Sequence, residues 1–571
     1  MRDAATGTAA ELYRQATQLR QDANYAEAER RLLRALELEH DCAAAHLELG
    51  LTYRDQARME DAVDYFQLAV HFAPALVAGW LELAGGLARL GRPEAALVAA
   101  RRATALEPRN FAAWLALGNL LKAGGDWSGA VDCYRMAAAS DGQSADAHCR
   151  LGYALYMVGR YTESRAAFDA ALALDPGMVQ AHHNLGLLLH ETGQAAQALA
   201  SFQRALEIDP QILETRACVA HALRDLGRFD EAISCYDEVL AADSRFADAV
   251  INRSYALLMR DDYPKGWAAY EQRFTTGGQV GRDFPYRPWQ GEALTGKRIL
   301  VYAEQGLGDE IMFASCIPDL LAQSAQCVVE CNNRLAPLFR RSFPHAHVHG
   351  GTKQDDIKWL AKLPPVDCQV AIGSLPHYFR QAASDFPARP AYLKADPRRV
   401  EYWSGELKAG TSLRVGIAWR GGTLRSRRFV RSIALPLWAP LLRSQGAAFY
   451  ALQYGDIAAE VEELRTQSGI TLARLGGAID DLDELAAIIG ALDLVISIDN
   501  TISHLAGSLG KAVWTLLPES PEWRYPRRGA RMSWYPSMRL FRRSPAEGWE
   551  AVLEQVAAAL AEMSGRARNQ A

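Results

Sequence analysis

The sequence predicts an α-helical solenoid in its first half and an α/β fold of two parallel-sheet domains in its second half. Up to about residue 274, small side chains recur every 34 residues without a slip. After residue 296, short apolar segments alternate with segments of helical character. A repeat of two helices cannot bury its apolar face alone, so its copies stack into a superhelix. Strands that alternate with helices are typical of a parallel sheet covered on both faces.

Two ladders of small residues and one of large residues define the repeat. The first small ladder is Ala28, Ala62, Ala96, Ala130, Ser164, Ala198 and Ala232, and the second is Ala16, Gly50, Ala84, Gly118, Gly152, Gly186 and Ala220. Large side chains stand at Leu32, Phe66, Tyr134, Phe168, Phe202 and Tyr236. These positions resemble the tetratricopeptide repeat, a helix–turn–helix unit whose stacked copies present a concave surface to another protein. We expect this superhelix over residues 1–274, with a weaker first repeat and a degenerate last unit.

Composition and charge argue against several classes of function. The chain has 571 residues with 62 basic and 67 acidic side chains, a formal net charge of -5, which gives no support for binding nucleic acid or an anionic membrane. No apolar run reaches the roughly 18–20 residues that a membrane-spanning helix needs, and the first residues lack a secretory pattern. The nine cysteines are scattered, which is typical of reduced thiols. We therefore predict a cytoplasmic protein.

The α/β half is expected after a linker at residues 275–296, whose aromatic side chains should dock rather than stay in solvent. An N-terminal domain is predicted at 297–396 and a C-terminal domain at 397–571, with a cleft between them. Strands are predicted at 298–302, 327–330, 367–372, 413–418, 448–452, 492–498 and 512–516. Helices are predicted at 309–321, 334–341, 435–442, 458–467, 501–509 and 547–563.

The first candidate site follows the first predicted strand, where open α/β sheets bind ligands. Gly306 and Gly308 would let the backbone turn sharply and approach a substrate closely. Asp309 stands at the start of the next predicted helix. It is either a helix cap or a general base that takes a proton from an acceptor hydroxyl. The third glycine of the dinucleotide-binding fingerprint is absent.

The second candidate site is the strand-to-helix junction at residues 497–507. Asn500 and Thr501, with the free backbone N–H groups of the junction, are candidates for a phosphate cradle. His504 is either a donor to a phosphate oxygen or a core histidine, and Asp499 is either a ligand-facing group or a cap.

The third candidate site leaves the strand at 413–418. Trp419 and Arg420 precede a Gly-Gly turn and a basic stretch that contains Arg428 and Arg431, and arginine binds phosphate oxygens in a fork geometry. A solvated loop is the alternative. Gln453, after the next predicted strand, completes the predicted donor-binding set.

These loops resemble those of a known family. Residues 289–318, 494–518 and 534–541 resemble bacterial fusions of tetratricopeptide repeats to a glycosyltransferase. The second half is similar to the heptosyltransferase-like GT-B group, which implies two Rossmann-like domains, and the plan is distantly similar to that of O-GlcNAc transferase and of nonulosonic-acid flagellin glycosyltransferases. The resemblance implies that Asp309 is the catalytic base. It also implies that residues 499–504 face the donor phosphates, although Asn500 replaces a hydroxyl residue there.

The resemblance implies a metal-independent glycosyltransferase without a cofactor. A nucleotide sugar would bind the C-terminal domain, and the sugar would pass to Ser or Thr of a protein on the concave face of the repeats, with flagellin as the acceptor that the resemblance suggests. The alternatives are a catalytically degenerate scaffold or chaperone and a transferase with a saccharide acceptor. The alternating His345, His347 and His349 lack a nearby carboxylate or cysteine, so we expect no metal site. The aromatics at 523–525 and 534–535 either wall the sugar pocket or lock the terminal helix.

Overall fold

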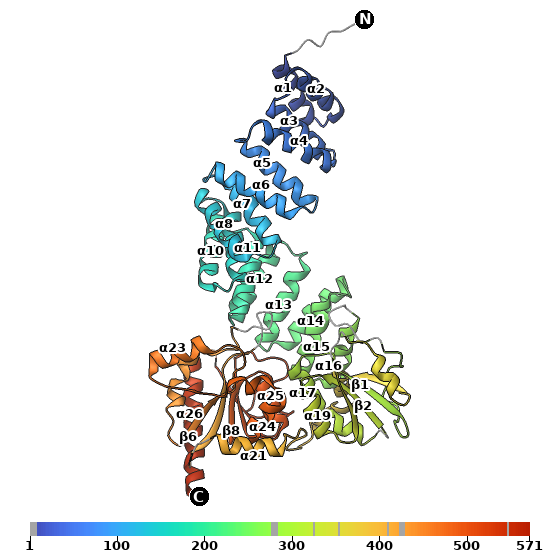
Figure 1. Cartoon of the computed structure of the whole chain (residues 1–571), viewed down its shortest axis with the longest axis vertical. Helices are drawn as coiled ribbons and strands as arrows, with labels where there is room; N and C mark the ends of the chain where they lie inside the picture. The colour runs from blue at the N-terminus through green and yellow to red at the C-terminus, as the bar shows by residue number, and fades with distance from the viewer. Residues whose placement is uncertain are drawn as a thin grey trace. The chain divides into compact units, whose positions relative to one another are not determined.

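The computed structural model describes residues 8–275, 282, 284–323, 326–351, 355–407, 410, 412–421, 429–544 and 547–570, the last four of these without their side chains (Figure 1). The chain divides into two compact units. The first comprises Met1–Leu188 and Arg204–Pro210, and the second comprises Leu189–Gln203 and Gln211–Ala571. Among the described residues no helix combines the length and the apolar character that crossing a membrane requires.

Paired helices of nearly constant length form the repeats. They are α1 (Ala9–Gln21), α2 (Tyr25–Leu38), α3 (Ala43–Asp55), α4 (Met59–Phe72), α5 (Val77–Arg89), α6 (Pro93–Leu106), α7 (Phe111–Ala123), α8 (Trp127–Ser140), α9 (Ala145–Met157), α10 (Tyr161–Leu174), α11 (Val179–Glu191), α12 (Ala195–Ile208), α13 (Leu213–Asp225), α14 (Phe229–Ala242), α15 (Ala247–Met259) and α16 (Tyr263–Tyr270). The turn within each pair holds one residue at positive φ, at Ala23, Ala57, Gly91, Gly125, Gly159, Gly193, Gly227 and Asp261. Glycine adopts this backbone conformation without steric cost, which accounts for its recurrence there.

The small-residue ladders mark the places where the two helices of a repeat come close. A Cβ added at Gly152 would lie 2.7 Å from the ring of Phe168, and a Cβ added at Gly118 would lie 2.7 Å from the ring of Tyr134. Both rings are buried. The repeat that carries Ala84 in this ladder has Ala100 instead of a ring at the facing position. Glycine therefore recurs in these repeats because an aromatic ring takes the space of its missing Cβ.

Gly152→Ala should destabilise the first unit by about 1–3 kcal/mol, because the added methyl group overlaps a buried ring. Gly85→Ala is the matched control, since a Cβ at this helical glycine of α5 meets no atom within 4 Å; it should stabilise the unit by about 0.5–1 kcal/mol. Urea denaturation monitored by circular dichroism measures both effects. Equal responses of the two variants would show that the ladder does not set the packing.

Two parallel sheets form the core of the second unit. The first has the order β3-β2-β1-β4, from β1 (Arg298–Tyr302), β2 (Gln326–Asn332), β3 (Ala346–Gly351) and β4 (Cys368–Ala371). The second has the order β10-β9-β8-β5-β6-β7, from β5 (Leu413–Ala418), β6 (Ala447–Ala451), β7 (Ala473–Arg474), β8 (Leu494–Ile498), β9 (Val513–Leu517) and β10 (Met538–Arg542). Each sheet therefore reverses its strand order beside its first strand, between β1 and β4 and between β5 and β8. The prediction of an α/β second half with parallel sheets is confirmed.

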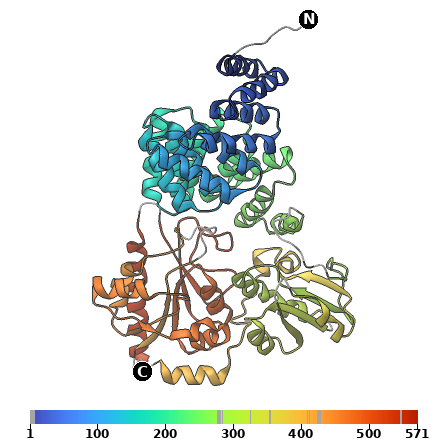
Figure 2. The same cartoon turned by 45° about the horizontal axis from the view of Figure 1, so that its top comes forward.

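Helices accompany both sheets (Figure 2). They are α17 (Leu307–Phe313), α18 (Ile317–Leu321), α19 (Ala336–Ser342), α20 (Leu375–Phe379), α21 (Pro397–Glu406), α22 (Ala439–Leu442), α23 (Ala458–Ser468), α24 (Leu482–Ala491), α25 (Thr501–Ser508) and α26 (Trp549–Gln570). The strands β3, β7 and β10 and the helices α20, α21 and α24 were not among the predicted elements. In α24 most residues are buried, so this helix lacks the polar face that produces a helical period.

The last two repeat helices pack directly against the α/β part of the second unit. Tyr255 of α15 stacks on Trp523 at 5.1 Å between ring centroids, and Trp267 of α16 contacts Trp523 and Trp534 edge to face. The indole Nε1 of Trp267 donates to the carbonyl of Arg380 at 2.8 Å. We expected these tryptophans either to wall a sugar pocket or to lock the terminal helix. In these contacts Trp523 and Trp534 instead pack against the last repeat helices.

The expected linker is docked in its described part. Phe284 and Trp289 are buried, and the backbone N–H of Trp289 donates to the carbonyl of Gln369, in β4, at 2.8 Å. This contact, together with the bridge between Pro288 and Gln369, extends the edge of the first sheet. The described part of the segment before β1 is therefore packed against the first sheet.

Candidate active site

A cavity of about 370 Å³ lies at the carboxyl ends of β1 and β8. Both strands flank the point at which their sheet reverses its strand order, which is where open α/β sheets bind ligands. The cavity is lined by Gly306, Leu307, Gly308, Asp309, Arg431, Tyr454, Asp499, Asn500, Thr501, His504, Glu522, Arg524 and Tyr525. Its size falls within the range of small-molecule sites. The first and second candidate sites of the sequence thus face one space.

A buried ion pair fixes the turn that leads into the first wall. Glu304 follows β1 and accepts from Arg273 Nη2 at 2.9 Å, and both side chains are only 1% exposed. The Glu304 carboxylate also accepts from the backbone N–H of Gly373 at 3.2 Å. Burial raises the pKa of Glu304, and the Arg273 guanidinium opposes this shift. The turn that carries Gly306 and Asp309 is therefore held by the end of the repeats.

Asp309 lies in the first turn of α17 and is paired with an arginine from the second sheet's loops. Its Oδ1 accepts from Arg524 Nε at 2.6 Å and stands 2.5 Å from Arg524 Nη2. Asp309 Oδ2 has no hydrogen-bond partner among the described residues. A Cβ on Gly308 would lie 3.4 Å from the His504 ring, so the two walls approach closely at this glycine.

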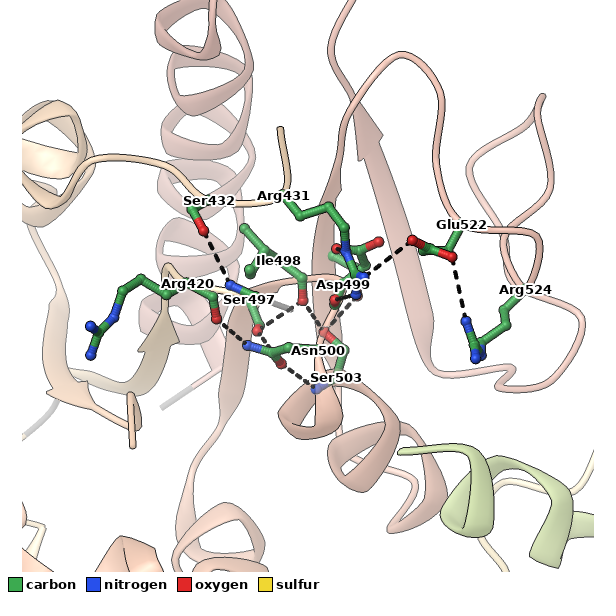
Figure 3. Close-up of polar contacts among 12 residues, drawn as sticks. Arg420, Arg431, Ser432, Ser497, Ile498, Asp499, Asn500, Ser503, Glu522 and Arg524 are labelled. Carbon is green, nitrogen blue, oxygen red and sulfur yellow. Dashed lines mark hydrogen bonds and ion pairs between the residues drawn. The ribbon is translucent and has the colours of Figure 1, made fainter. Parts of the chain in front are cut away.

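Asn500 caps helix α25 and forms the second wall. Its Oδ1 accepts from the backbone N–H groups of Ile502 and Ser503 at 3.0 and 3.3 Å, and its Nδ2 donates to the Arg420 carbonyl at 3.2 Å (Figure 3). The side-chain oxygen is thus used in the cap and Nδ2 in a contact with the loop after β5, while the predicted role of Asn500 as a phosphate ligand stays a prediction. The N–H groups of Asn500 and Thr501 donate to no described residue and remain available to a ligand.

Five charged side chains of alternating sign cross the cavity. Arg431 donates from Nε to Asp499 Oδ1 at 2.8 Å and from Nη1 to Glu522 Oε1 at 3.2 Å, and Glu522 Oε2 stands 3.7 Å from Arg524 Nη1 (Figure 3). Arg524 in turn reaches Asp309 of the other sheet's wall. We call this series the charge chain: Asp309, Arg524, Glu522, Arg431 and Asp499. It joins the loops after β1, β5, β8 and β9.

His504 is held as a neutral imidazole. Burial, together with the nearby charges of Arg524 and Arg431, lowers its pKa to about 3. Its Nδ1 lies 2.9 Å from the Tyr535 hydroxyl, and its Nε2 has no hydrogen-bond partner among the described residues. The ring is therefore oriented by Tyr535 and leaves one nitrogen for a ligand.

Asp499 is buried beneath the cavity at 1% exposure. Burial raises its pKa to about 6, although the Arg431 guanidinium favours the ionised form. Its Oδ2 has no hydrogen-bond partner among the residues that the structure describes. Asp499 Oδ1 thus holds Arg431, the cap of α25 is Asn500, and a contact of Asp499 with a ligand stays a prediction.

Other predicted donor residues lie outside the cavity. Trp419 is buried in the core, and its backbone N–H donates to Gln453 Oε1 at 3.1 Å. Gln453 also accepts from the N–H of Arg420 at 2.8 Å and lines a separate hollow. Arg420 turns away from the charge chain (Figure 3). It donates to the carbonyls of Tyr454 and Asp456. Arg428 lies outside the described residues.

Sequence reasoning missed Glu522 and Tyr454 and left Arg524 and Tyr525 without a role in binding charge. Glu522 and Arg524 come from the loop between β9 and β10, which has no recognisable motif. Arg524 and Asp309 are 215 positions apart in sequence. Only the strand order brings them together, so no local signal could have found the pair.

Within the described part of the chain, no three His, Cys, Asp or Glu side chains gather in a way that could hold a metal ion. Of the three alternating histidines, His349 stacks on Trp359 with 3.8 Å between ring centroids. This ring packing gives His349 a structural role on β3.

Family models of the tetratricopeptide repeat match the first half of the chain. The matched residues are 13–76, 149–211 and 220–276 for one model, 118–159 for a second and 77–119 for a third. The region therefore consists of tetratricopeptide repeats, as predicted, which suggest binding of a protein partner. The chain is also 35% identical over 325 residues to Protein FlbA of Caulobacter vibrioides (strain ATCC 19089 / CIP 103742 / CB 15), which covers 54% of each chain. It thus spans about half the length of this curated relative.

Solved repeat structures resemble parts of the chain weakly. The C-terminal part of a TPR repeat-containing protein from Cytophaga hutchinsonii is 15% identical with a TM-score of 0.36, covering 42% of this chain and 98% of its own. Pseudomonas aeruginosa pilF is 16% identical with a TM-score of 0.33, covering 36% and 94%. YrrB, described as a TPR protein with an unusual peptide-binding site, is 17% identical with a TM-score of 0.30, covering 32% and 95%. Scores at this level carry no argument about fold or function.

The pKa of Asp499 predicts a pH effect on stability. The pKa of an Asp is near 3.9 in an unfolded chain, and that of Asp499 is about 6 in the folded chain. Protonated Asp499 therefore stabilises the fold fully below both pKa values, and this stabilisation is lost as pH rises through about 6. Two pKa units correspond to about 3 kcal/mol. The free energy of unfolding of the wild type, minus that of Asp499→Asn, should therefore fall by about 3 kcal/mol between about pH 3 and neutral pH, and about half of this fall should come above about pH 5.

Urea denaturation followed by tryptophan fluorescence at a series of pH values checks this difference. Asp230→Asn serves as the control, because the Asp230 side chain is 85% exposed. A difference between wild type and Asp499→Asn that stays constant with pH would contradict the assignment.

Proposed function

We propose that the protein is a metal-independent glycosyltransferase of the GT-B plan that transfers a sugar from a nucleotide-sugar donor to Ser or Thr of a protein partner. One observation carries the proposal: Asp309 and the wall formed by Arg431, Thr501 and His504 line the same cavity, at the strand-order reversals of two parallel sheets. A carboxylate opposite anion-binding groups is what glycosyl transfer from a phosphate donor requires.

In the proposed reaction, the hydroxyl oxygen of the acceptor attacks the anomeric carbon of the donor. The bond between that carbon and the phosphate oxygen breaks, and its electron pair leaves with the nucleoside phosphate. Asp309 accepts the hydroxyl proton. Arg431, the N–H of Thr501 and the neutral His504 stabilise the charge that grows on the leaving phosphate. Guanidinium groups and backbone N–H groups serve here in the role that a cation takes in other phosphate sites.

The tetratricopeptide repeats support a protein acceptor. Their concave surfaces bind extended partners, and binding remote from the reacting atoms raises the local concentration of the acceptor. The resemblance to flagellin glycosyltransferases makes flagellin, in the cytoplasm, the proposed acceptor and a nonulosonic acid the proposed sugar. The degenerate scaffold remains the competing proposal. The feature that favours a scaffold is the replacement of the family's hydroxyl residue by Asn500, but asparagine caps the helix equally well, so this replacement does not imply a loss of activity.

Asp309→Asn should lower sugar transfer by about 10²–10⁴-fold, because a general base contributes on this order. The assay incubates the full chain with flagellin of the same organism and a panel of nucleotide sugars, and it reads the intact mass of the acceptor. Loss of donor without acceptor modification would indicate hydrolysis, and neither event with any donor would favour the scaffold.

Asp493→Asn is the matched control for this assay. Asp493 is also paired with an arginine, Arg414 at 3.2 Å, but it precedes β8 and so lies at the opposite end of the strand from the cavity. Its transfer rate should equal that of the wild type. If Asp309→Asn transfers sugar as fast as this control, Asp309 is not the base.

A further inference from the structure

The contact between Arg524 and Asp309 occupies the proposed base. Both side chains are largely buried, at 19% and 16% exposure, and both guanidinium contacts fall on the same carboxylate oxygen, Oδ1. Arg524 belongs to the loop after β9, whereas Asp309 belongs to α17 after β1. The pair therefore spans the two sheets and places a cation on the group that would accept the proton.

An anion entering the cavity meets guanidinium groups that already have carboxylate partners. Arg431 is paired with Asp499 and Glu522, and Arg524 with Asp309 and Glu522. The charge chain holds three carboxylates for two guanidinium groups. Among these described residues, a phosphate that pairs with a guanidinium therefore competes with a carboxylate for it.

The two arginines differ in how firmly they are held. Arg431 binds the Asp499 side chain, donates from Nη2 to the Asp499 carbonyl at 2.6 Å and reaches Glu522, so three separate acceptors fix it. Arg524 has one oxygen of Asp309 and a more distant Glu522, 3.7 Å away. Its guanidinium also lies over the Trp523 ring, 4.9 Å from the centroid, a contact that leaves its N–H groups in place for an acceptor. Arg524 is the guanidinium that can change partners.

We propose that Arg524 is a ligand of the donor phosphate, and that its ion pair with Asp309 occupies this carboxylate until the phosphate binds. The phosphate takes the guanidinium, and Asp309 becomes free to accept the hydroxyl proton. The inference rests on the proposed function, whose donor-binding set it extends by Arg524. It makes donor binding a precondition for activating the acceptor.

Competition between the carboxylate and the phosphate predicts opposite effects of two substitutions. Asp309→Asn removes the competitor, so inorganic phosphate and pyrophosphate should bind about tenfold more tightly. Arg524→Gln removes the ligand, so both anions should bind at least about tenfold more weakly. In the double variant, Asp309→Asn should no longer tighten binding, because the two residues act through one contact.

Isothermal titration calorimetry on the full chain at mildly alkaline pH measures these affinities, with Asp493→Asn as the control that should match the wild type. Unchanged or weaker anion binding by folded Asp309→Asn would overturn the inference, and this near-isosteric variant decides the question even if Arg524→Gln fails to fold. Tightening that persists in the double variant would also overturn it.

The anion titration needs no turnover, so it separates the two proposals. A chain that shows the opposite effects but transfers no sugar supports the exchange of Arg524 and overturns only the proposed reaction. A chain that transfers sugar while Asp309→Asn leaves anion binding unchanged overturns the exchange alone.

Discussion

The charge chain is the constraint on which the candidate site depends. Buried carboxylates and guanidinium groups are costly unless each finds a partner of opposite sign. Asp309, Arg524, Glu522, Arg431 and Asp499 meet this requirement only when the loops after β1, β5, β8 and β9 are all in place. The pairing therefore selects one arrangement of these loops, and the same groups that stabilise the arrangement line the cavity.

The junction between β8 and α25 shows how a change in sequence can preserve a chemical role. The family resemblance places a hydroxyl residue where this chain has Asn500. Asparagine caps a helix as well as serine or threonine does, and here its Oδ1 binds two of the helix's first N–H groups. The groups offered to a ligand are then the N–H of Thr501 and the free nitrogen of His504. Neither depends on the identity of the capping side chain.

Patterns in the sequence were sufficient for the repeats and for the central strands. The 34-residue ladder fixed the helix pairs, and apolar runs located β1, β5 and β8. Helix α24 was not predicted, because most of its residues are buried and its sequence therefore lacks the roughly 3.6-residue alternation of apolar and polar side chains. Strand β7 was not predicted, because both of its residues are exposed and it has no apolar run. In the site, Asp309 and His504 stood in motifs. Glu522 and Arg524 did not, because strand order rather than neighbouring sequence places them at the cavity.

The sequence also does not show which of several arginines after one strand lines the cavity. Arg420 and Arg431 both follow β5, yet Arg420 binds the carbonyls of Tyr454 and Asp456 and so braces the loop after β6. Gln453 in that loop binds back to the backbone of Trp419 and Arg420, which closes the brace. The cations among the described side chains that line the cavity are then Arg431 and Arg524. Since carboxylates outnumber these described cations, the proposed recognition of a phosphate is an exchange of partners rather than the filling of an empty positive site.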